Sequence, residues 1–167
     1  KEGANIIVAD LNDEKGKQFA EELNSKGTKN KASFIKVNVA EAESVENLVT
    51  ETVLTFGGLD VMISNAGILR AGSLDEMDQA TFELMTKVNY TGYFLCSKYA
   101  QKVMNIQHKY KPDFYMDIIQ INSKSGLKGS NKNFAYAGGK FGGIGLTQSF
   151  ALELMPSNIK VNSICPG

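Results

Sequence analysis

Short apolar runs alternate with amphipathic helical patterns along the whole chain. The first run, Asn5–Ala9, has no polar interruption, which is typical of a strand covered on both faces. Further strands are predicted at 33–37, 59–64, 117–121 and 159–164, and helices at about 12–27, 45–56, 79–108 and 134–155. Because helical crossovers of this length join parallel strands, the pattern predicts an α/β fold, a doubly wound parallel sheet with helices on both faces.

Composition narrows the possible functions. The 167 residues are enough for one domain, and 18 basic and 18 acidic residues cancel, so no basic surface indicates a nucleic acid or an anionic membrane. No apolar run approaches the roughly 20 residues of a membrane span. Cys96, Cys165 and the single His108 lack ligand spacing, so we expect no metal site and two reduced thiols in a cytoplasmic protein.

Both ends of the sequence interrupt an element. Lys1–Gly3 reads as the tail of a helix with Gly3 in a left-handed cap, and Pro166–Gly167 directly follow a strand. We therefore expect residues 1–167 to form a single but incomplete domain, with its N- and C-terminal parts missing.

Polar residues follow several of the predicted strands. They are Asp10, Asn38, Asn65 and Ser123. Parallel sheets of this kind bind ligands beyond the carboxyl ends of their strands. Each residue alone is typical of an ordinary turn, but four that lead into one crevice favour a binding site.

Tyr136 and Lys140 stand four residues apart on a predicted helix, so their side chains share a face. An ammonium near a phenol stabilises the phenolate, which would let the tyrosine act as acid and base near neutral pH. The spacing alone occurs by chance in many helices, as a half-buried tyrosine beside a solvated lysine. Gly138, Gly139, Gly142 and Gly143 crowd the same helix at up to about 1 kcal/mol each, which indicates a close approach by a backbone or another helix.

In this order the motifs resemble the short-chain dehydrogenase/reductase family over nearly the whole chain. The matching segments are Asp10, Ser64–Gly67, Val88–Asn89, Ser123 thirteen residues before Tyr136, Tyr136–Lys140 and Lys160–Gly167. The resemblance implies an NAD(P)-binding Rossmann-type domain, an alcohol–ketone oxidoreductase and a homo-oligomer, a dimer or tetramer. The glycine-rich helix and the long helix before it would form the subunit interface, although packing within one subunit explains the glycines equally well.

The resemblance also implies roles for individual residues. Tyr136 would exchange the proton of the alcohol, Lys140 would support it and bind the nicotinamide ribose, and Ser123 would hold the reacting oxygen. Asn89 would keep a water in the proton relay. The implied cofactor-binding positions are Asp10, Leu11, Asn38, Val39, Asn65, Ala66, Gly67, Tyr136, Lys140, Pro166 and Gly167.

The residues after the first strand favour NAD over NADP. A carboxylate at Asp10 can accept hydrogen bonds from the ribose hydroxyls and would repel a 2′-phosphate, and neither Leu11 nor Asn12 supplies an arginine. The chain departs from the family at Asn38, where aspartate is usual, and at Ser64, where asparagine is usual. The glycine-rich phosphate loop, expected before residue 1, is absent, which leaves open whether residues 1–167 alone hold NAD.

Within the family, Asn89–Cys96 and Ile118–Gly126 resemble enzymes that interconvert sorbitol 6-phosphate and fructose 6-phosphate with NAD. Ser123, Lys124 and Tyr136 are then the substrate-binding candidates. Lys124, with Lys128 and Lys132 in the same loop, would contact the phosphate, although each is equally well explained as a solvated lysine. Other small-molecule substrates, an unphosphorylated polyol or a 3-oxoacyl thioester, stay open. A non-catalytic NAD-binding regulator stays open too, but all four catalytic positions are filled.

Overall fold

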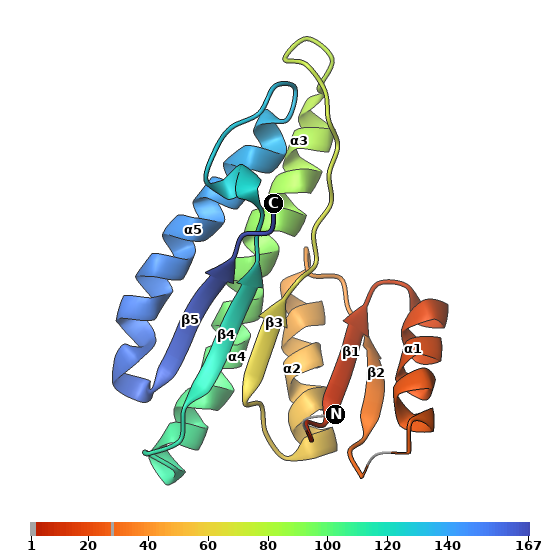
Figure 1. Cartoon of the computed structure of the whole chain (residues 1–167), viewed down its shortest axis with the longest axis vertical. Helices are drawn as coiled ribbons and strands as arrows, with labels where there is room; N and C mark the ends of the chain where they lie inside the picture. Colours follow the sequence, from red (N-terminus) through yellow and green to blue (C-terminus); the bar gives the residue numbers. More distant parts are fainter. Residues whose placement is uncertain (1–2, 28) are drawn as a thin grey trace.

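The computed structural model describes residues 3–27 and 29–167. Its elements follow one another in the predicted alternation (Figure 1). They are β1 (Ile6–Asp10), α1 (Asp13–Ser25), β2 (Ala32–Lys36), α2 (Ala42–Phe56), β3 (Val61–Ser64), α3 (Gln79–Thr86), a π-helical turn (Lys87–Thr91), α4 (Gly92–Tyr110), β4 (Met116–Ile121), α5 (Phe134–Leu154) and β5 (Ile159–Ile164), with 3₁₀ turns at Lys124–Gly126 and Met155–Ser157.

Local signals set the helix ends where they were predicted. The side chain of Asn12 accepts a hydrogen bond from the backbone N–H of Lys15 at 3.0 Å and caps α1. Gly57 ends α2 with a φ of +83°, a left-handed conformation that favours glycine. The predicted helix at 79–108 is present as α3 and α4, which continue into each other through the π-helical turn. The predicted helix tail at Lys1–Gly3 lies largely outside the described residues, and Gly3 itself has a φ of +91°.

The strands run parallel, as predicted, but they form two sheets among the described residues. One sheet pairs β1 with β2, and the other has the order β3–β4–β5. Figure 1 shows the sheets beside each other, with β1 and β3 at the facing edges. The predicted doubly wound parallel fold is confirmed, and its strands form two sheets in the described part of the chain because no described strand lies between these edges.

A large cavity separates the two facing edges. It has a volume of about 1300 Å³ and is lined along β1 by Ile6 and Ala9 and along β3 by Val61 and Ile63. The backbone groups on these edges lack strand partners among residues 3–27 and 29–167. The run at Asn5–Ala9, predicted to be covered on both faces, is therefore mostly exposed, with Ile7 and Val8 half-buried.

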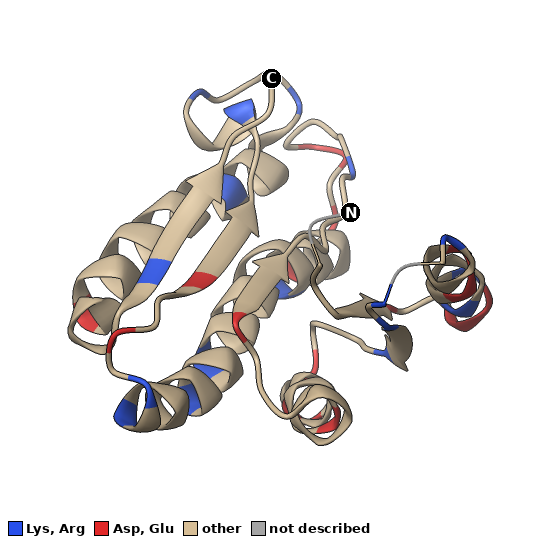
Figure 2. Ribbon diagram, turned by 60° about the horizontal axis from the view of Figure 1, so that its bottom comes forward, with Lys and Arg blue, Asp and Glu red and all other residues tan. Residues whose placement is uncertain are grey.

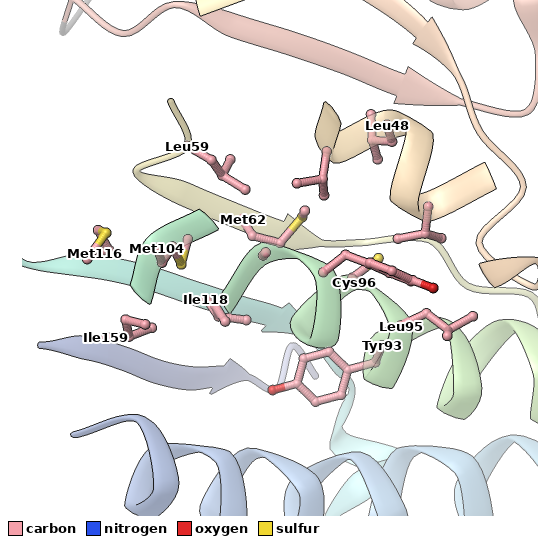
Figure 3. Packing of buried hydrophobic residues seen from close by; sticks show 14 of the residues in the cluster. Leu48, Leu59, Met62, Tyr93, Leu95, Cys96, Met104, Met116, Ile118 and Ile159 are labelled. Atoms are coloured by element: carbon pink, nitrogen blue, oxygen red, sulfur yellow. The ribbon is translucent and has the colours of Figure 1, made fainter. Parts of the chain in front are cut away.

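The main core lies on one face of β3–β4–β5, where α2, α4 and α5 cover it. Met62, Ile118 and Val161 point from the three strands into a cluster shared with these helices, and Figure 3 shows Met62 and Ile118 beside Cys96 and Tyr93 of α4. Burial of a large apolar side chain stabilises a fold by about 1.5–3 kcal/mol. This cluster therefore holds the second half of the protein together.

The opposite face of the same sheet is open. Val61 is 47% exposed and Ile63 is 57% exposed, and burial alternates along all three strands. Among the described residues, helices cover both faces only at β1–β2, where α1 packs on the side of Phe34 and the core packs on the side of Ile35. The doubly wound arrangement is present, but its second layer of helices is confined to the first two strands in this part of the protein.

Two expected absences can be compared with the described residues. No helix in 3–27 and 29–167 has both the length and the apolarity needed to cross a bilayer. The same residues contain no group of three or more His, Cys, Asp and Glu side chains arranged to hold a metal.

The two cysteines differ in burial. Cys96 is a buried free thiol, whereas Cys165, which follows the end of β5, is a half-exposed free thiol.

Candidate active site

The predicted cofactor positions in the first half of the protein line one cavity. They follow β1, β2 and β3, and the cavity is the one between the two sheets: Asp10, Leu11, Asn38, Val39, Asn65, Ala66 and Gly67. The carboxylate of Asp10 accepts a hydrogen bond from the N–H of Asn12 at 2.8 Å, which fixes it at the strand end. Three of the four polar strand-end residues, Asp10, Asn38 and Asn65, thus meet at one crevice, whereas Ser123 does not line it.

Asn89 is buried in the π-helical turn and binds the segment that follows β3. Its Oδ1 accepts from the N–H of Ile68 and its Nδ2 donates to the C=O of Ile68, both at 2.8 Å. π-Helical turns are rare and occur frequently at functional sites. A Cβ at Gly67 would lie 3.2 Å from Asn89 Oδ1 and 3.8 Å from Lys140 Nζ, so this turn and α5 meet beside Gly67.

Lys140 is buried on α5, with only 4% of the residue exposed. Its Nζ donates a hydrogen bond to the C=O of Ile121 at 2.9 Å and lies 5.5 Å from the centre of the Tyr136 ring. Burial lowers the pKa of Lys140 below its ordinary value, and the nearby Cys165 thiol opposes this shift. Lys140 is therefore a buried residue and not the solvated lysine expected if the Tyr136–Lys140 spacing were due to chance.

Ser123 begins the 3₁₀ turn at the end of β4. It is half-buried, and its Oγ accepts a hydrogen bond from the N–H of Ser125 at 3.1 Å. The next residue, Lys124, donates its N–H to the C=O of Pro166 at 2.7 Å. The predicted catalytic serine and the Pro166–Gly167 segment after β5 therefore lie side by side, away from the lining of the cavity between the sheets.

Two of the α5 glycines lie where a larger side chain would clash with a neighbouring element. A Cβ at Gly142 would lie 2.7 Å from the ring of Tyr90, and a Cβ at Gly143 would collide with the side chain of Gln120. Gly138 and Gly145 face open space instead. The predicted close approach is confirmed at Gly142 and Gly143, and it occurs within one subunit.

The loop between β4 and α5 is basic. Lys124, Lys128 and Lys132 are all exposed, and no acidic residue lies between them. Figure 2 shows blue segments on the loops beside the C-terminus. An anion near Ser123 would therefore meet cationic side chains.

Sequence reasoning missed two buried polar residues next to this site. Gln120 and Asn122 of the β4 segment lie beneath Ser123 and contact α5. The available signal was a pair of amides two residues apart in the otherwise apolar run 118–122, which places both on one face.

The candidate residues thus lie after the carboxyl ends of parallel strands, and sequence comparison identifies the family. The sequence model described as "short chain dehydrogenase" matches residues 1–167, so the protein belongs to the short-chain dehydrogenase/reductase family.

Three relatives with named activities extend the comparison. Sorbitol-6-phosphate 2-dehydrogenase of Escherichia coli K12 is 35% identical over 169 residues, and trans-4-hydroxycyclohexanecarboxylate dehydrogenase of Sinomonas cyclohexanicum is 36% identical over 169 residues; both matches cover 99% of this chain. The crystal structure of sorbitol-6-phosphate 2-dehydrogenase from Erwinia amylovora has a TM-score of 0.91 and 39% identity over 98% of this chain. This chain spans 62% of the length of each.

Proposed function

We propose that the protein is an NAD-dependent dehydrogenase that interconverts sorbitol 6-phosphate and fructose 6-phosphate. The observation that carries the proposal is the exposed cation of Lys124 directly after Ser123, at the end of β4. Two relatives named for sorbitol 6-phosphate support the same substrate. The third relative is named for a hydroxylated carboxylate, so an alcohol that carries an anionic group is common to all three.

Four side chains would carry the chemistry. Tyr136 takes the hydroxyl proton during alcohol oxidation and returns it during ketone reduction. Lys140 supplies a positive charge beside the phenol, and its hydrogen bond to the C=O of Ile121 fixes the position of the ammonium. Ser123 donates a hydrogen bond to the reacting oxygen, and Asn89 organises the wall of the crevice through Ile68.

The crevice fits NAD by the chemistry of its lining. Asp10 offers a carboxylate to the hydroxyls of the adenine ribose and disfavours the 2′-phosphate of NADP. Asn38 and Val39 would flank the adenine, and Asn65, Ala66 and Gly67 would face the rest of the cofactor. When bound, NAD would supply the hydride acceptor for oxidation of the alcohol.

The test is a substrate panel with the purified protein. NADH formation is followed with sorbitol 6-phosphate, sorbitol, trans-4-hydroxycyclohexanecarboxylate and a 3-hydroxyacyl thioester. We expect kcat/KM for sorbitol 6-phosphate to exceed that for sorbitol by about 100-fold or more, because a cationic site left without its anion loses a charge-assisted contact. Equal rates for sorbitol, or a preference for the thioester, would overturn the substrate. NAD binding without turnover of any alcohol would indicate a regulator.

We also propose a homo-oligomer that forms through α4 and α5. Both helices expose large apolar side chains, Phe94 on α4 and Phe141 and Leu152 on α5. Exposed apolar patches commonly mark protein interfaces. Light scattering of the purified protein should give the mass of a dimer or tetramer, and Phe141→Lys should shift that mass toward the monomer.

A further inference from the structure

A buried polar network lies beneath Ser123 and Lys140. Asn122 is 5% exposed and Gln120 is 2% exposed, and both point from the β4 segment toward α5. Buried polar groups are costly unless they are hydrogen-bonded. The hydrogen bonds of these two amides therefore have to offset the cost of burying them beside the catalytic candidates.

The Asn122 amide connects three separate parts of the site. Its Oδ1 accepts from the N–H of Ser123 at 2.8 Å. Its Nδ2 donates to the backbone C=O of Lys140 at 3.0 Å and to Oε1 of Gln120 at 2.8 Å. Both amide donors and the acceptor are thus used, which fixes the orientation of the amide.

Lys140 is consequently held at both ends by two successive residues. Its ammonium donates to the C=O of Ile121, and its own carbonyl accepts from Asn122. Ser123 follows directly and is tied to the same Asn122 amide. The end of β4 therefore fixes where the hydroxyl and the ammonium stand relative to each other.

The surroundings are shaped to hold Asn122 in place. Ser163 of β5 donates to Gln120 Oε1 at 3.1 Å, which braces the partner of Asn122. A Cβ at Gly126 would lie 2.5 Å from Asn122 Oδ1 and 3.0 Å from the Lys140 carbonyl, so only glycine leaves room there. Such a fully satisfied polar network is rigid.

We propose that Asn122 is a positioning residue that sets the relative placement of the Ser123 hydroxyl and the Lys140 ammonium. This inference rests on the proposed oxidoreductase function, which it deepens. A purely structural asparagine would contribute to stability and leave the chemistry of the site unchanged.

The test compares Asn122→Ala and the smaller polar change Asn122→Ser with the wild-type protein. A displacement of about 1 Å in reacting groups can lower rates by about 100-fold, so we expect kcat to fall about 10- to 100-fold. KM for NAD should stay within about threefold, since Asn122 does not line the cavity. Asn24→Ala is the matched control, because the Asn24 amide also clamps a backbone, that of Ala32 in β2, and does not line the cavity.

A second readout does not depend on turnover. The pKa of Lys140, followed by NMR of labelled lysine side chains, should rise toward its ordinary value in both Asn122 variants, since a loosened ammonium regains water. Tyr136 and Cys165 are the titratable neighbours and are unchanged in each variant. Asn24→Ala should lower thermal stability without moving the pKa of Lys140.

The outcomes separate the two proposals. Wild-type turnover together with unchanged kcat and unchanged Lys140 pKa in the Asn122 variants would overturn the positioning role. Absence of wild-type turnover on the whole panel would refute the proposed function, and the Lys140 pKa would still decide whether Asn122 places the ammonium. Equal losses of kcat in Asn24→Ala and Asn122→Ser would show that Asn122 is a structural residue.

Discussion

The ammonium of Lys140 lies 5.5 Å from the centre of the Tyr136 ring, one turn away on α5. Helical spacing brings the two side chains to one face, but the Ile121 carbonyl and the surrounding protein keep the charge out of bulk water. A partly desolvated cation interacts more strongly with a neighbouring group than one in bulk water. The end of β4 as well as α5 itself therefore fixes the Lys140 ammonium beside Tyr136.

Replacing Tyr136 with phenylalanine should remove turnover and preserve NAD binding. General acid–base catalysis contributes about 10²- to 10⁴-fold, and we expect a loss in kcat of that order. The check is kcat with sorbitol 6-phosphate beside NAD affinity by calorimetry. Tyr115→Phe, an exposed tyrosine before β4, is the control and should behave as the wild type. Retained turnover in Tyr136→Phe would refute the mechanism.

The pH profile should reflect the lowered pKa of Lys140. The mechanism needs a protonated Lys140, and its charge is lost as pH rises through a value below the ordinary one. Turnover should thus decline on the alkaline side at a pH below the ordinary pKa of a lysine. Lys140→Arg keeps its charge at all accessible pH values, so its residual rate should lack this decline. An identical alkaline decline in both proteins would assign it to another group.

The same shift should appear in stability. Between the lowered folded pKa of Lys140 and its unfolded value, the unfolded chain binds more protons, so the free energy of unfolding should rise with pH. Lys140→Met has no group that titrates at this position. Denaturation of both proteins across this alkaline range should show the wild type gaining stability relative to the variant; a gain by the variant would reverse the sign.

Asp10 should control the choice between NAD and NADP. Replacing it with alanine removes the acceptor for the ribose hydroxyls and the repulsion toward a 2′-phosphate, so the preference for NAD should fall about 10- to 100-fold. The measurement is kcat/KM with each cofactor. Asp13→Ala removes a carboxylate from α1 that does not line the cavity, and it should leave the preference unchanged.

The basic loop should act on the phosphate of the substrate. Substituting Lys124, Lys128 and Lys132 together with glutamine should raise KM for sorbitol 6-phosphate about tenfold or more, since charge-assisted contacts are lost. The KM for NAD should not change. The double variant that retains Lys124 shows whether the lysine next to Ser123 suffices. An unaltered KM in the triple variant would identify the lysines as solvated surface residues.

Two glycines on α5 should respond in opposite directions to alanine. Gly143→Ala would push a Cβ into Gln120, and overpacking of this kind costs about 1–3 kcal/mol. Gly145 faces open space, so Gly145→Ala should stabilise the helix by about 0.5–1 kcal/mol. Chemical denaturation measures both. A stable Gly143→Ala would mean that β4 and α5 are less tightly packed than described.

The order of strands and helices was predictable because it depends on local periodicity. Asn12 and Gly57 mark helix ends through their own backbones, and the crowded glycines of α5 indicated a close approach that the structure places at Tyr90 and Gln120. These features involve short stretches of sequence. Each could be inferred without knowing what lies opposite in space.

The division of the strands into two sheets and the hydrogen-bond network around Asn122 could not be predicted from local sequence patterns. Apolar residues such as Val61 and Ile63 read as buried, yet their burial depends on what packs against them. The contacts of Asn122 with Lys140 join residues eighteen positions apart, and the π-helical turn at Asn89 has no simple periodic signal. Tertiary partners decide these features, and a single sequence pattern does not specify them.

The facing edges of β1 and β3 have no strand partner among the described residues, which should affect the behaviour of residues 1–167 in solution. An unpaired strand edge can pair with a strand of another molecule. The exposed side chains of Val61 and Ile63 add apolar surface beside this edge. Concentrated solutions of residues 1–167 should therefore form β-rich aggregates that bind amyloid dyes. Lysine in place of Ile63 should delay their appearance.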